Sequence, residues 1–342
     1  MHDPEAMPER LAAFLTELDG GRTARVTAYE AMIGGYSRLM ARADVHWSDG
    51  TTEVLVLRGD PPPGKSMAET DRDAEHALLR ALGDSGVIAT PRVRGYDPQG
   101  DRLGTKCIVI EFVHGQPLQA ILNGTEAATH STHAEALVDS MAAVHSIDPG
   151  VLAEVLPHPP DWHTYMHGLI DRFRSSDEGH VEPMPVLRYV AAWLESHLPP
   201  PLPLRVVHSD FQPANIMVDT DGVHQMVDWE FAHIGDPRED LGYYNVYAAA
   251  LGPNLFALDP DGFLARYRER TGFDEAAVNM RTLAYFSSLA AISVYSQILA
   301  GAGAMARGEN GGLMTTYTLN ALTVGHSNFL AGCAATDDPE TH

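Results

Sequence analysis

The chain has few cysteines and few basic residues. Only Cys107 and Cys333 occur among the 342 residues, and neither belongs to a CxxC pair. This scarcity argues against a disulfide framework or a cysteine-rich metal site, so we expect a reducing, cytoplasmic compartment. The 23 Lys and Arg residues stand against 46 Asp and Glu residues, which gives a formal net charge of −23. Such a balance argues against a nucleic-acid partner, because phosphate contacts need clustered Lys and Arg.

Long uninterrupted apolar runs are also absent. The most apolar stretch, Leu289–Ala306, is broken by Ser293, Tyr295 and Gln297, so we interpret it as a buried helix and expect no membrane span. The first residues are acidic and contain no apolar stretch long enough for a signal peptide. Apolar residues make up 44% and charged residues 20%, which is ordinary globular usage. The length favours two lobes around a cleft.

The first third of the chain has the pattern of strands around one inserted helix. A helix is predicted near the start, over Pro8–Leu18, and a second over Glu69–Leu82, where apolar residues fall on one helical face. Runs of β-branched and apolar residues bounded by turn signals predict strands at Arg25–Met32, Arg38–Trp47, Thr51–Arg58, Arg92–Tyr96 and Thr105–Phe112. We therefore predict a small β-rich domain over residues 1–113.

Helical periodicity dominates the remainder. Helices are predicted at Ala134–His145, Pro185–Leu198, Pro260–Arg270 and Glu275–Leu299. The second predicted domain therefore covers residues 114–342 and is mostly helical, so that the fold class is α+β.

Two polar segments interrupt this helical region. The stretch VVHSDFQPANIMVD, residues 206–219, places Asp210 and Asn215 between two apolar runs, and the stretch HQMVDWE that follows carries Asp228. If the two apolar runs beside the turn at residues 219–222 form a hairpin, the loop with Asp210 and Asn215 lies beside the strand end with Asp228. Carboxylate and amide oxygens of this kind suit Mg²⁺ and are poor ligands for zinc.

These motifs carry a resemblance. The pattern H-x-D-x-x-x-x-N followed by an Asp at a strand end resembles the catalytic and metal-binding loops of the protein-kinase-like fold. The forms HSDFQPAN and DWEFAHIGDPREDL are more similar to the aminoglycoside phosphotransferase and choline kinase group, and within it to the kinase-like domain fused to some acyl-CoA dehydrogenases. The resemblance covers most of the chain, since a β-rich lobe, an inserted helix and a helical lobe follow one another in the order typical of this group.

The resemblance implies a bilobal fold with a small β-rich N-lobe that contains one inserted helix and a larger helical C-lobe. It also implies ATP- and Mg²⁺-dependent transfer of the γ-phosphate to the hydroxyl of a small-molecule substrate. The acceptor would be an antibiotic or a hydroxylated, partly apolar metabolite. Oligomeric state is not predicted.

Carried over residue by residue, Asp210 resembles the base that accepts the substrate's hydroxyl proton. Asn215 and Asp228 resemble the Mg²⁺ ligands. Glu230 is two residues beyond Asp228, on the same face if the strand continues, and would hold a second Mg²⁺. Phosphoryl transfer depends on positioning and charge neutralisation, which is why these groups must converge.

Two further residues are expected to support this loop. His208 is interpreted as support for the loop backbone, and Asp240 as its anchor through backbone amides. The competing interpretation of Asp210 itself is a turn-capping aspartate.

The phosphate-binding end departs from the protein-kinase pattern. No GxGxxG motif occurs, and the resemblance suggests that backbone amides at Gly34 and Gly35, together with Ser37, cover the ATP phosphates. Arg58 stands on the third strand where a phosphate-pairing lysine would be. Its expected partner is Glu75 on the inserted helix, for which a solvated helix carboxylate is the plainer interpretation.

The last strand of the small lobe ends at Glu111 and Val113, where the resemblance places backbone hydrogen bonds to adenine. Acceptor pockets in this fold are built by the helical lobe, so its aromatic residues are candidates for the acceptor site: Trp162, Tyr165, His167, Tyr243, Tyr244, Tyr247, Tyr285, Phe286 and Tyr295. The stretch LAYFSSLAAISVYSQIL offers an apolar wall with scattered hydroxyls, which favours a partly apolar acceptor over a polycationic one.

Two other functions stay open on the sequence. A metal-dependent hydrolase would use His208, Asp210, Asp228, His233 and Asp236, but it leaves Asn215 and the β-rich lobe unexplained. A nucleotide-binding pseudokinase would keep the fold without turnover. A serine hydrolase is disfavoured, because no GxSxG motif occurs.

Overall fold

The computed structural model describes residues 6–32, 39–60, 71–126, 129–178, 185–306, 308 and 326–337. The chain divides into two compact units, one made of residues 1–116 and 217–230 and the other of residues 117–216 and 231–342. The predicted boundary after residue 113 lies near the first division, whereas the sequence did not indicate that residues 217–230 join the first unit. No helix in the described ranges is long and apolar enough to cross a membrane.

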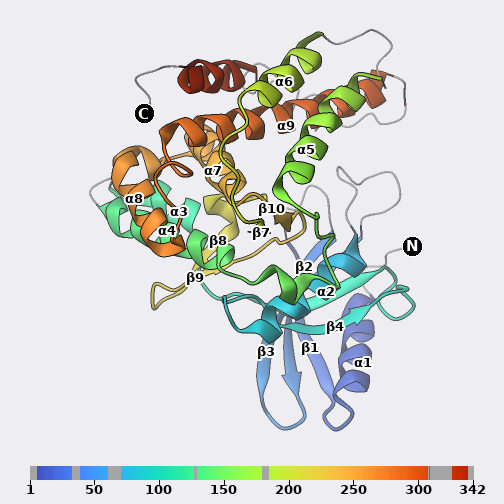
Figure 1. Cartoon of the computed structure of the whole chain (residues 1–342). Coiled ribbons are helices and arrows are strands. Elements are labelled where there is room, and N and C mark those ends of the chain that lie inside the picture. Colours follow the sequence, from blue (N-terminus) through green and yellow to red (C-terminus); the bar gives the residue numbers. More distant parts are fainter. Residues whose placement is uncertain are drawn as a thin grey trace. The chain divides into compact units, whose positions relative to one another are not determined.

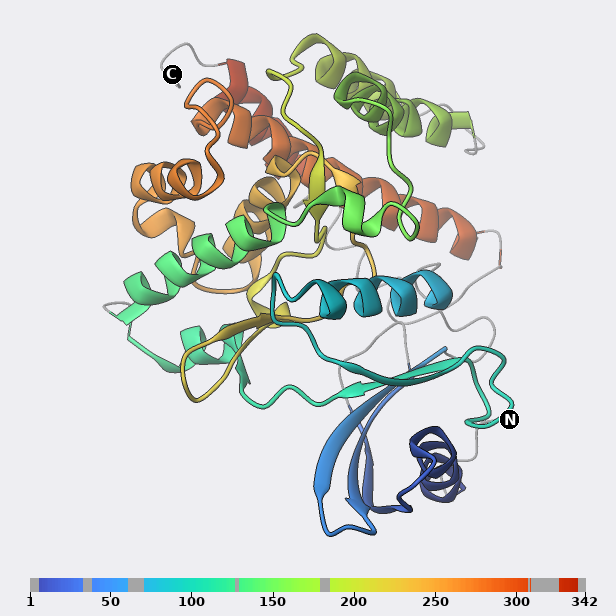
Figure 2. The same ribbon diagram turned by 60° about the horizontal axis from the view of Figure 1, so that its bottom comes forward.

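A five-stranded antiparallel sheet forms the centre of the first unit (Figure 1), with strand order β1-β2-β3-β5-β4. Its strands are β1 (Ala24–Ala31), β2 (Leu39–Trp47), β3 (Thr52–Gly59), β4 (Val93–Asp97) and β5 (Cys107–Glu111). Helix α1 (Met7–Asp19) packs against β1, and α2 (Arg72–Ser85) packs against β4 and β5. Figure 2 shows the sheet lying between the two helices.

The spacing of apolar residues explains how α1 meets the sheet. Its buried residues, Met7, Leu11, Phe14 and Leu15, recur at helical spacing and form one face. In β2, Ala41, Ala43, Val45 and Trp47 alternate with more exposed residues, so one side of the strand faces this core. The opposite side of the sheet carries Arg58, which points to α2.

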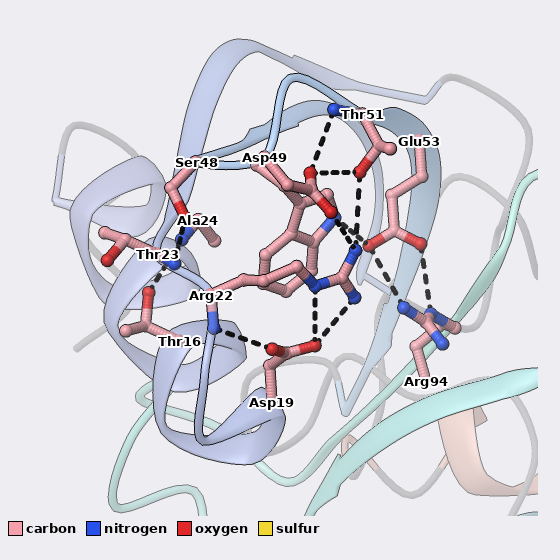
Figure 3. Close-up of polar contacts among 11 residues, drawn as sticks. Thr16, Asp19, Arg22, Thr23, Ala24, Ser48, Asp49, Thr51, Glu53 and Arg94 are labelled. Carbon is pink, nitrogen blue, oxygen red and sulfur yellow. Dashed lines mark hydrogen bonds and ion pairs between the residues drawn. The ribbon is translucent and has the colours of Figure 1, made fainter.

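Arg22 joins the turn before β1 to the turn between β2 and β3 (Figure 3). Its Nε donates to Asp19 Oδ1 at 3.1 Å, and its Nη1 donates to Asp49 Oδ2 at 3.3 Å. The guanidinium carbon lies 4.3 Å from the ring centroid of Trp47, which is a cation–π contact. Trp47 Nε1 in turn donates to Glu53 at 2.8 Å. Exposed ion pairs of this kind contribute little to stability and mainly fix the two turns.

The second unit is helical. Its helices are α3 (Leu118–Gly124), α4 (His130–His145), α5 (Trp162–Glu178), α6 (Pro185–Ser196), α7 (Arg238–Leu251), α8 (Pro260–Thr271) and α9 (Met280–Ala306), with a further helix over residues 326–337. One core cluster combines residues of α5, α6, α9 and the last helix, among them Trp193, Tyr285 and Phe329. In Figure 1, α5 and α6 lie beside α9, which agrees with this cluster.

Short strands and 3-10 turns complete the described structure, and β7, η3, β8 and β9 among them carry the two motif segments. They are β6 (Gln116–Pro117), η2 (Pro149–Leu152), β7 (Arg205–Val207), η3 (Pro213–Asn215), β8 (Ile216–Val218), β9 (His224–Met226), β10 (His233–Gly235) and η4 (Phe256–Leu258). Strand β7 pairs with β10, and β8 lies next to β9. The predicted hairpin between β8 and β9 is confirmed, and Asp219 closes its turn by accepting from the amides of Asp221 and Val223.

A glycine allows α7 and α9 to pack backbone against backbone. A Cβ atom added at Gly242 would lie 2.3 Å from the carbonyl carbon of Phe286 and 2.5 Å from its oxygen. These are main-chain atoms, so a side-chain rotation cannot relieve the overlap. The close approach brings Tyr243 of α7 and Phe286 of α9 to the same part of the second unit.

We expect Gly242→Ala to lower the free energy of unfolding by about 1–3 kcal/mol, because the overlap outweighs the better helix propensity of alanine. Chemical denaturation followed by circular dichroism measures this change. Gly168→Ala in α5 is the matched control, since a Cβ there meets nothing within 4 Å; we expect it to be neutral or stabilising. Equal stability of the two variants would contradict this account of the α7–α9 contact.

Candidate active site

Asp210 lies in the loop that follows β7, and its carboxylate accepts three hydrogen bonds. Oδ1 accepts from Gln212 Nε2 at 2.9 Å and from the Tyr243 hydroxyl at 2.5 Å. Oδ2 accepts from Asn215 Nδ2 at 2.6 Å. The residue is 9% exposed. Three donors on a nearly buried carboxylate hold it in one orientation, which a simple turn cap does not require.

Asp240, the third residue of α7, binds the backbone of this loop. Its Oδ2 accepts from His208 N at 2.9 Å and its Oδ1 from Ser209 N at 2.8 Å. His145 Nε2 lies 3.0 Å from Asp240 Oδ2. Burial alone raises the pKa of Asp240, but the hydrogen bonds and charges of His145 and His208 together outweigh it and lower the pKa below its ordinary value. The two hydrogen bonds from backbone amides to Asp240 are the contacts that the predicted anchoring role requires.

The loop backbone is strained next to the candidate base. Within this loop, His208 Nδ1 accepts a hydrogen bond from Asp210 N at 3.3 Å. Ser209 has φ of 67°, a left-handed conformation that a residue with a Cβ rarely adopts. In the described part of the chain, the only other non-glycine residue with positive φ is Asp228, also at 67°. Strain of this kind persists where surrounding contacts enforce it, and it gathers at functional sites.

Within the first unit, Arg58 connects the sheet to Asp228. Its Nε donates to Glu75 Oε1 at 2.9 Å, and its Nη2 donates to Asp228 Oδ1 at 2.6 Å. Arg58 is 5% exposed and Glu75 is 4% exposed. The predicted Arg58–Glu75 pair is therefore present and buried, and Glu75 is not the solvated helix carboxylate of the plainer interpretation.

Sequence reasoning missed two parts of this network. The Arg58–Asp228 pair joins residues 170 positions apart, and no local pattern indicates it. Arg72 is fully buried and pairs with Glu75 and, at 3.0 Å, with Asp60. Arg72 lies three residues before Glu75 on a predicted helix, and this spacing could have indicated their ion pair.

The two carboxylates also affect the ionisation of Arg58. Burial alone lowers the pKa of Arg58, but Glu75 and Asp228 outweigh it and raise the pKa.

The condition under which Glu230 would lie on the same strand face as Asp228, a strand that continues through both residues, is not met. Strand β9 ends at Met226, before Asp228, and the positive φ at Asp228 breaks the alternation. A metal-binding role for Glu230 stays a prediction without that support.

The structure describes only some of the small-lobe residues that are predicted to contact the nucleotide. Gly34, Gly35 and Ser37 lie outside the described residues. Glu111 N donates to Arg92 O at 2.9 Å, so an adenine contact at Glu111 would have to use its carbonyl. Val113 lies two residues beyond the end of β5, in irregular backbone.

One of the ligands expected for a hydrolytic metal site, Asp236, is engaged elsewhere. Asp236 is fully buried; its Oδ2 accepts from Trp162 Nε1 and from Arg238 Nη2, both at 2.6 Å, and its Oδ1 accepts from Arg238 N. Among the residues that the structure describes, no three His, Cys, Asp or Glu side chains gather as a metal site. These contacts disfavour the hydrolase interpretation.

The donor chemistry at Asn215 and Asp228 fits Mg²⁺ better. Asn215 uses its amide nitrogen on Asp210, so its other end, a carbonyl oxygen, is the group suited to a hard cation. Asp228 offers a carboxylate whose Oδ1 accepts from Arg58.

Comparison with known proteins agrees with these observations. The model of the phosphotransferase enzyme family matches residues 37–280. A candidate acyl-CoA dehydrogenase of Arabidopsis thaliana is 25% identical over 280 residues, which cover 73% of this chain and 34% of that protein. The chain thus spans about a third of the length of this relative.

Solved structures confirm the predicted bilobal, protein-kinase-like α+β fold. A candidate aminoglycoside phosphotransferase of Ralstonia eutropha matches with a TM-score of 0.72 at 18% identity, over 95% of this chain and 97% of that one. The GDP complex of an aminoglycoside 2'-phosphotransferase matches with a TM-score of 0.60 at 13% identity, over 96% and 98%. At these identities the likeness concerns the fold alone.

Proposed function

Because the chain belongs to the phosphotransferase enzyme family, we propose that it transfers the γ-phosphate of ATP to a hydroxyl group of a small molecule, with Mg²⁺. The observation that supports this most is the Asp210 carboxylate, which is nearly buried and fixed by three donors within the H-x-D-x-x-x-x-N loop. Nucleotide use is supported by a structural neighbour that is a GDP complex.

In the proposed reaction, Asp210 accepts the proton of the acceptor hydroxyl. The hydroxyl oxygen forms a bond to the γ-phosphorus, the bond from that phosphorus to the β,γ-bridging oxygen breaks, and ADP leaves with the electron pair. The products are ADP, a phosphate monoester and one proton. Positioning of the base is the main contribution of these residues, as in other phosphoryl transfers.

Asn215 and Asp228 are the proposed ligands of Mg²⁺, with Glu230 as a further candidate. When bound, the ion would neutralise charge on the ATP phosphates. Glu111, Val113, Gly34, Gly35 and Ser37 are the proposed nucleotide contacts.

A screen of ADP release with ATP and Mg²⁺ tests this proposal. The panel contains aminoglycosides, macrolides, choline-like amines and hydroxy acids. We expect at least one compound to stimulate ADP release in a saturable manner, and the apolar wall of α9 favours a partly apolar alcohol over a polycationic sugar. ATP binding without stimulation by any compound would instead indicate a pseudokinase and contradict the proposal.

Arg58 is the proposed contact for the ATP phosphates, oriented by Glu75. Arg58→Lys should keep part of the activity, because the charge survives while the bidentate fork is lost, and Arg58→Ala should raise the KM for ATP about tenfold or more. Arg94→Ala is the control, since Arg94 is an arginine of the same sheet that pairs with Glu53 near the surface. Thermal unfolding checks that each variant is folded. An unchanged KM and kcat in folded Arg58→Ala would refute the assignment.

A further inference from the structure

The second unit contains a small cavity beside the residue that hydrogen-bonds to the candidate base. Its volume is about 90 Å³. A cavity of about 150 Å³ takes benzene, so this one suits a short alkyl group and is too small for a sugar ring. The size therefore indicates a site for one end of an acceptor and not for a whole antibiotic.

One side of the cavity wall, formed by α9, is mostly apolar, while Ser209, Glu239 and Tyr243 make the other side polar. Phe286, Leu289, Ala290 and Val294 line it from this helix, together with the hydroxyl-bearing Ser293. No cation lines the cavity among the described residues. The α9 side of the wall thus offers an apolar surface on which an alkyl group can pack.

The one carboxylate on the wall is already engaged. Glu239 Oε1 accepts from the Tyr165 hydroxyl at 2.6 Å and from Asp236 N at 2.9 Å. Its Oε2 lies 3.5 Å from His233 Nε2. A cationic group in the cavity would have to compete with these partners for the carboxylate of Glu239. The lining would therefore stabilise such a group only weakly.

Tyr243 is the residue that links this cavity to Asp210. Tyr243 lines the cavity, and its hydroxyl donates to Asp210 Oδ1 at 2.5 Å. Burial, followed by the charge of Asp210, raises the pKa of Tyr243 well above its ordinary value, so the hydroxyl keeps the proton that it donates. Tyr247 stacks on Tyr243 with ring centroids 4.2 Å apart and steadies the ring.

Building on the proposed function, we propose that the cavity binds a short uncharged alkyl arm of the acceptor alcohol and that Tyr243 positions Asp210 for its hydroxyl. A carboxylate has about four lone-pair sites, and Gln212, Tyr243 and Asn215 occupy three of them. The remaining site is on Oδ2 and is the place for the acceptor hydroxyl. Tyr243 acts through Asp210 and is therefore a positioning residue.

Tyr243→Phe removes the hydroxyl and keeps the ring that lines the cavity. With ATP and the most active compound of the acceptor screen, we expect kcat to fall about tenfold, because the carboxylate gains rotational freedom, while the KM for the acceptor stays within about twofold. Tyr189→Phe is the control: Tyr189 in α6 is 54% exposed and does not line the cavity, so kcat should stay near that of the wild type. Both variants should unfold at the same temperature as the wild type.

Ala290→Leu fills the cavity from α9. We expect it to raise the KM for the acceptor about tenfold and to leave the KM for ATP unchanged, since only the alkyl arm is excluded. Equal kcat values for Tyr243→Phe and Tyr189→Phe, or an unchanged acceptor KM in Ala290→Leu, would overturn the inference while the wild type still turns over. Absence of turnover in the wild type would instead refute the proposed function.

Discussion

Asp210→Asn should reduce acceptor-dependent turnover by about a hundredfold or more, the scale of loss usual for a general base. The asparagine keeps the size of the side chain and the bonds that its oxygen accepts, but it cannot take the hydroxyl proton. Because Asp210 is proposed to act on the acceptor and not on the nucleotide, the affinity for ATP should stay within about twofold of the wild type. Steady-state ADP release and calorimetric titration of ATP measure the two quantities.

The control for this substitution is Asp219→Asn. Asp219 is also an aspartate that accepts hydrogen bonds, in the turn between β8 and β9, and it has no proposed role in the reaction. Its turnover should be close to that of the wild type. If Asp210→Asn kept more than about a tenth of wild-type turnover, Asp210 would not be the base.

Asp240→Asn should have the second large effect, a loss of about 3–5 kcal/mol in the free energy of unfolding. The charge of Asp240 is fully buried and is compensated by His145 and by the amides of His208 and Ser209. An amide nitrogen at this position would face at least one of these donors. Turnover should fall as well, because the strained backbone at Ser209 would lose the contact that enforces it.

The effect of Asp240 should depend on pH. A lowered pKa in the folded protein means that the stabilisation is complete above the unfolded value, about 3.8, and is lost as pH falls through the lower folded value. The stability difference between the wild type and Asp240→Asn should therefore be constant from neutral pH down to about pH 5 and shrink below about pH 4. Denaturation at several pH values measures it. A difference that grew on acidification would contradict the ionised, buried state of Asp240.

Local sequence patterns were sufficient for the parts of the site that lie within one loop. Asp210 and Asn215 are five residues apart, and the 3-10 turn η3 brings their side chains to 2.6 Å. The β-rich unit with its inserted helix also followed from short-range signals, because alternation and turn residues act over a few positions.

Contacts that depend on tertiary packing were not predictable in the same way. The Arg58–Asp228 pair and the Tyr243–Asp210 bond join separate elements, and α7 was not predicted as a helix at all. Its apolar residues face several neighbours, so it lacks the single apolar stripe that marks an amphipathic helix. Helix α9 begins at Met280, five residues after the predicted start, because Asn279 and Thr282 cap it there with reciprocal side-chain bonds.

Of the aromatic residues proposed for the acceptor site, Trp162, Tyr244, Tyr285 and Phe286 are buried. Tyr243 and Phe286 line the cavity beside the base. The helical spacing of these aromatic residues did not distinguish core residues from residues that line the cavity, because both kinds occur on helices that contact the same core.

The central claim is tested most directly by following the γ-phosphate itself. ATP radiolabelled at the γ-phosphorus is incubated with Mg²⁺, the protein and the acceptor from the screen, and the products are separated. The account predicts that the label appears in a phosphate monoester of the acceptor alcohol with the wild type and does not with Asp210→Asn. Label that stays in ATP, or that appears only as inorganic phosphate, would contradict it.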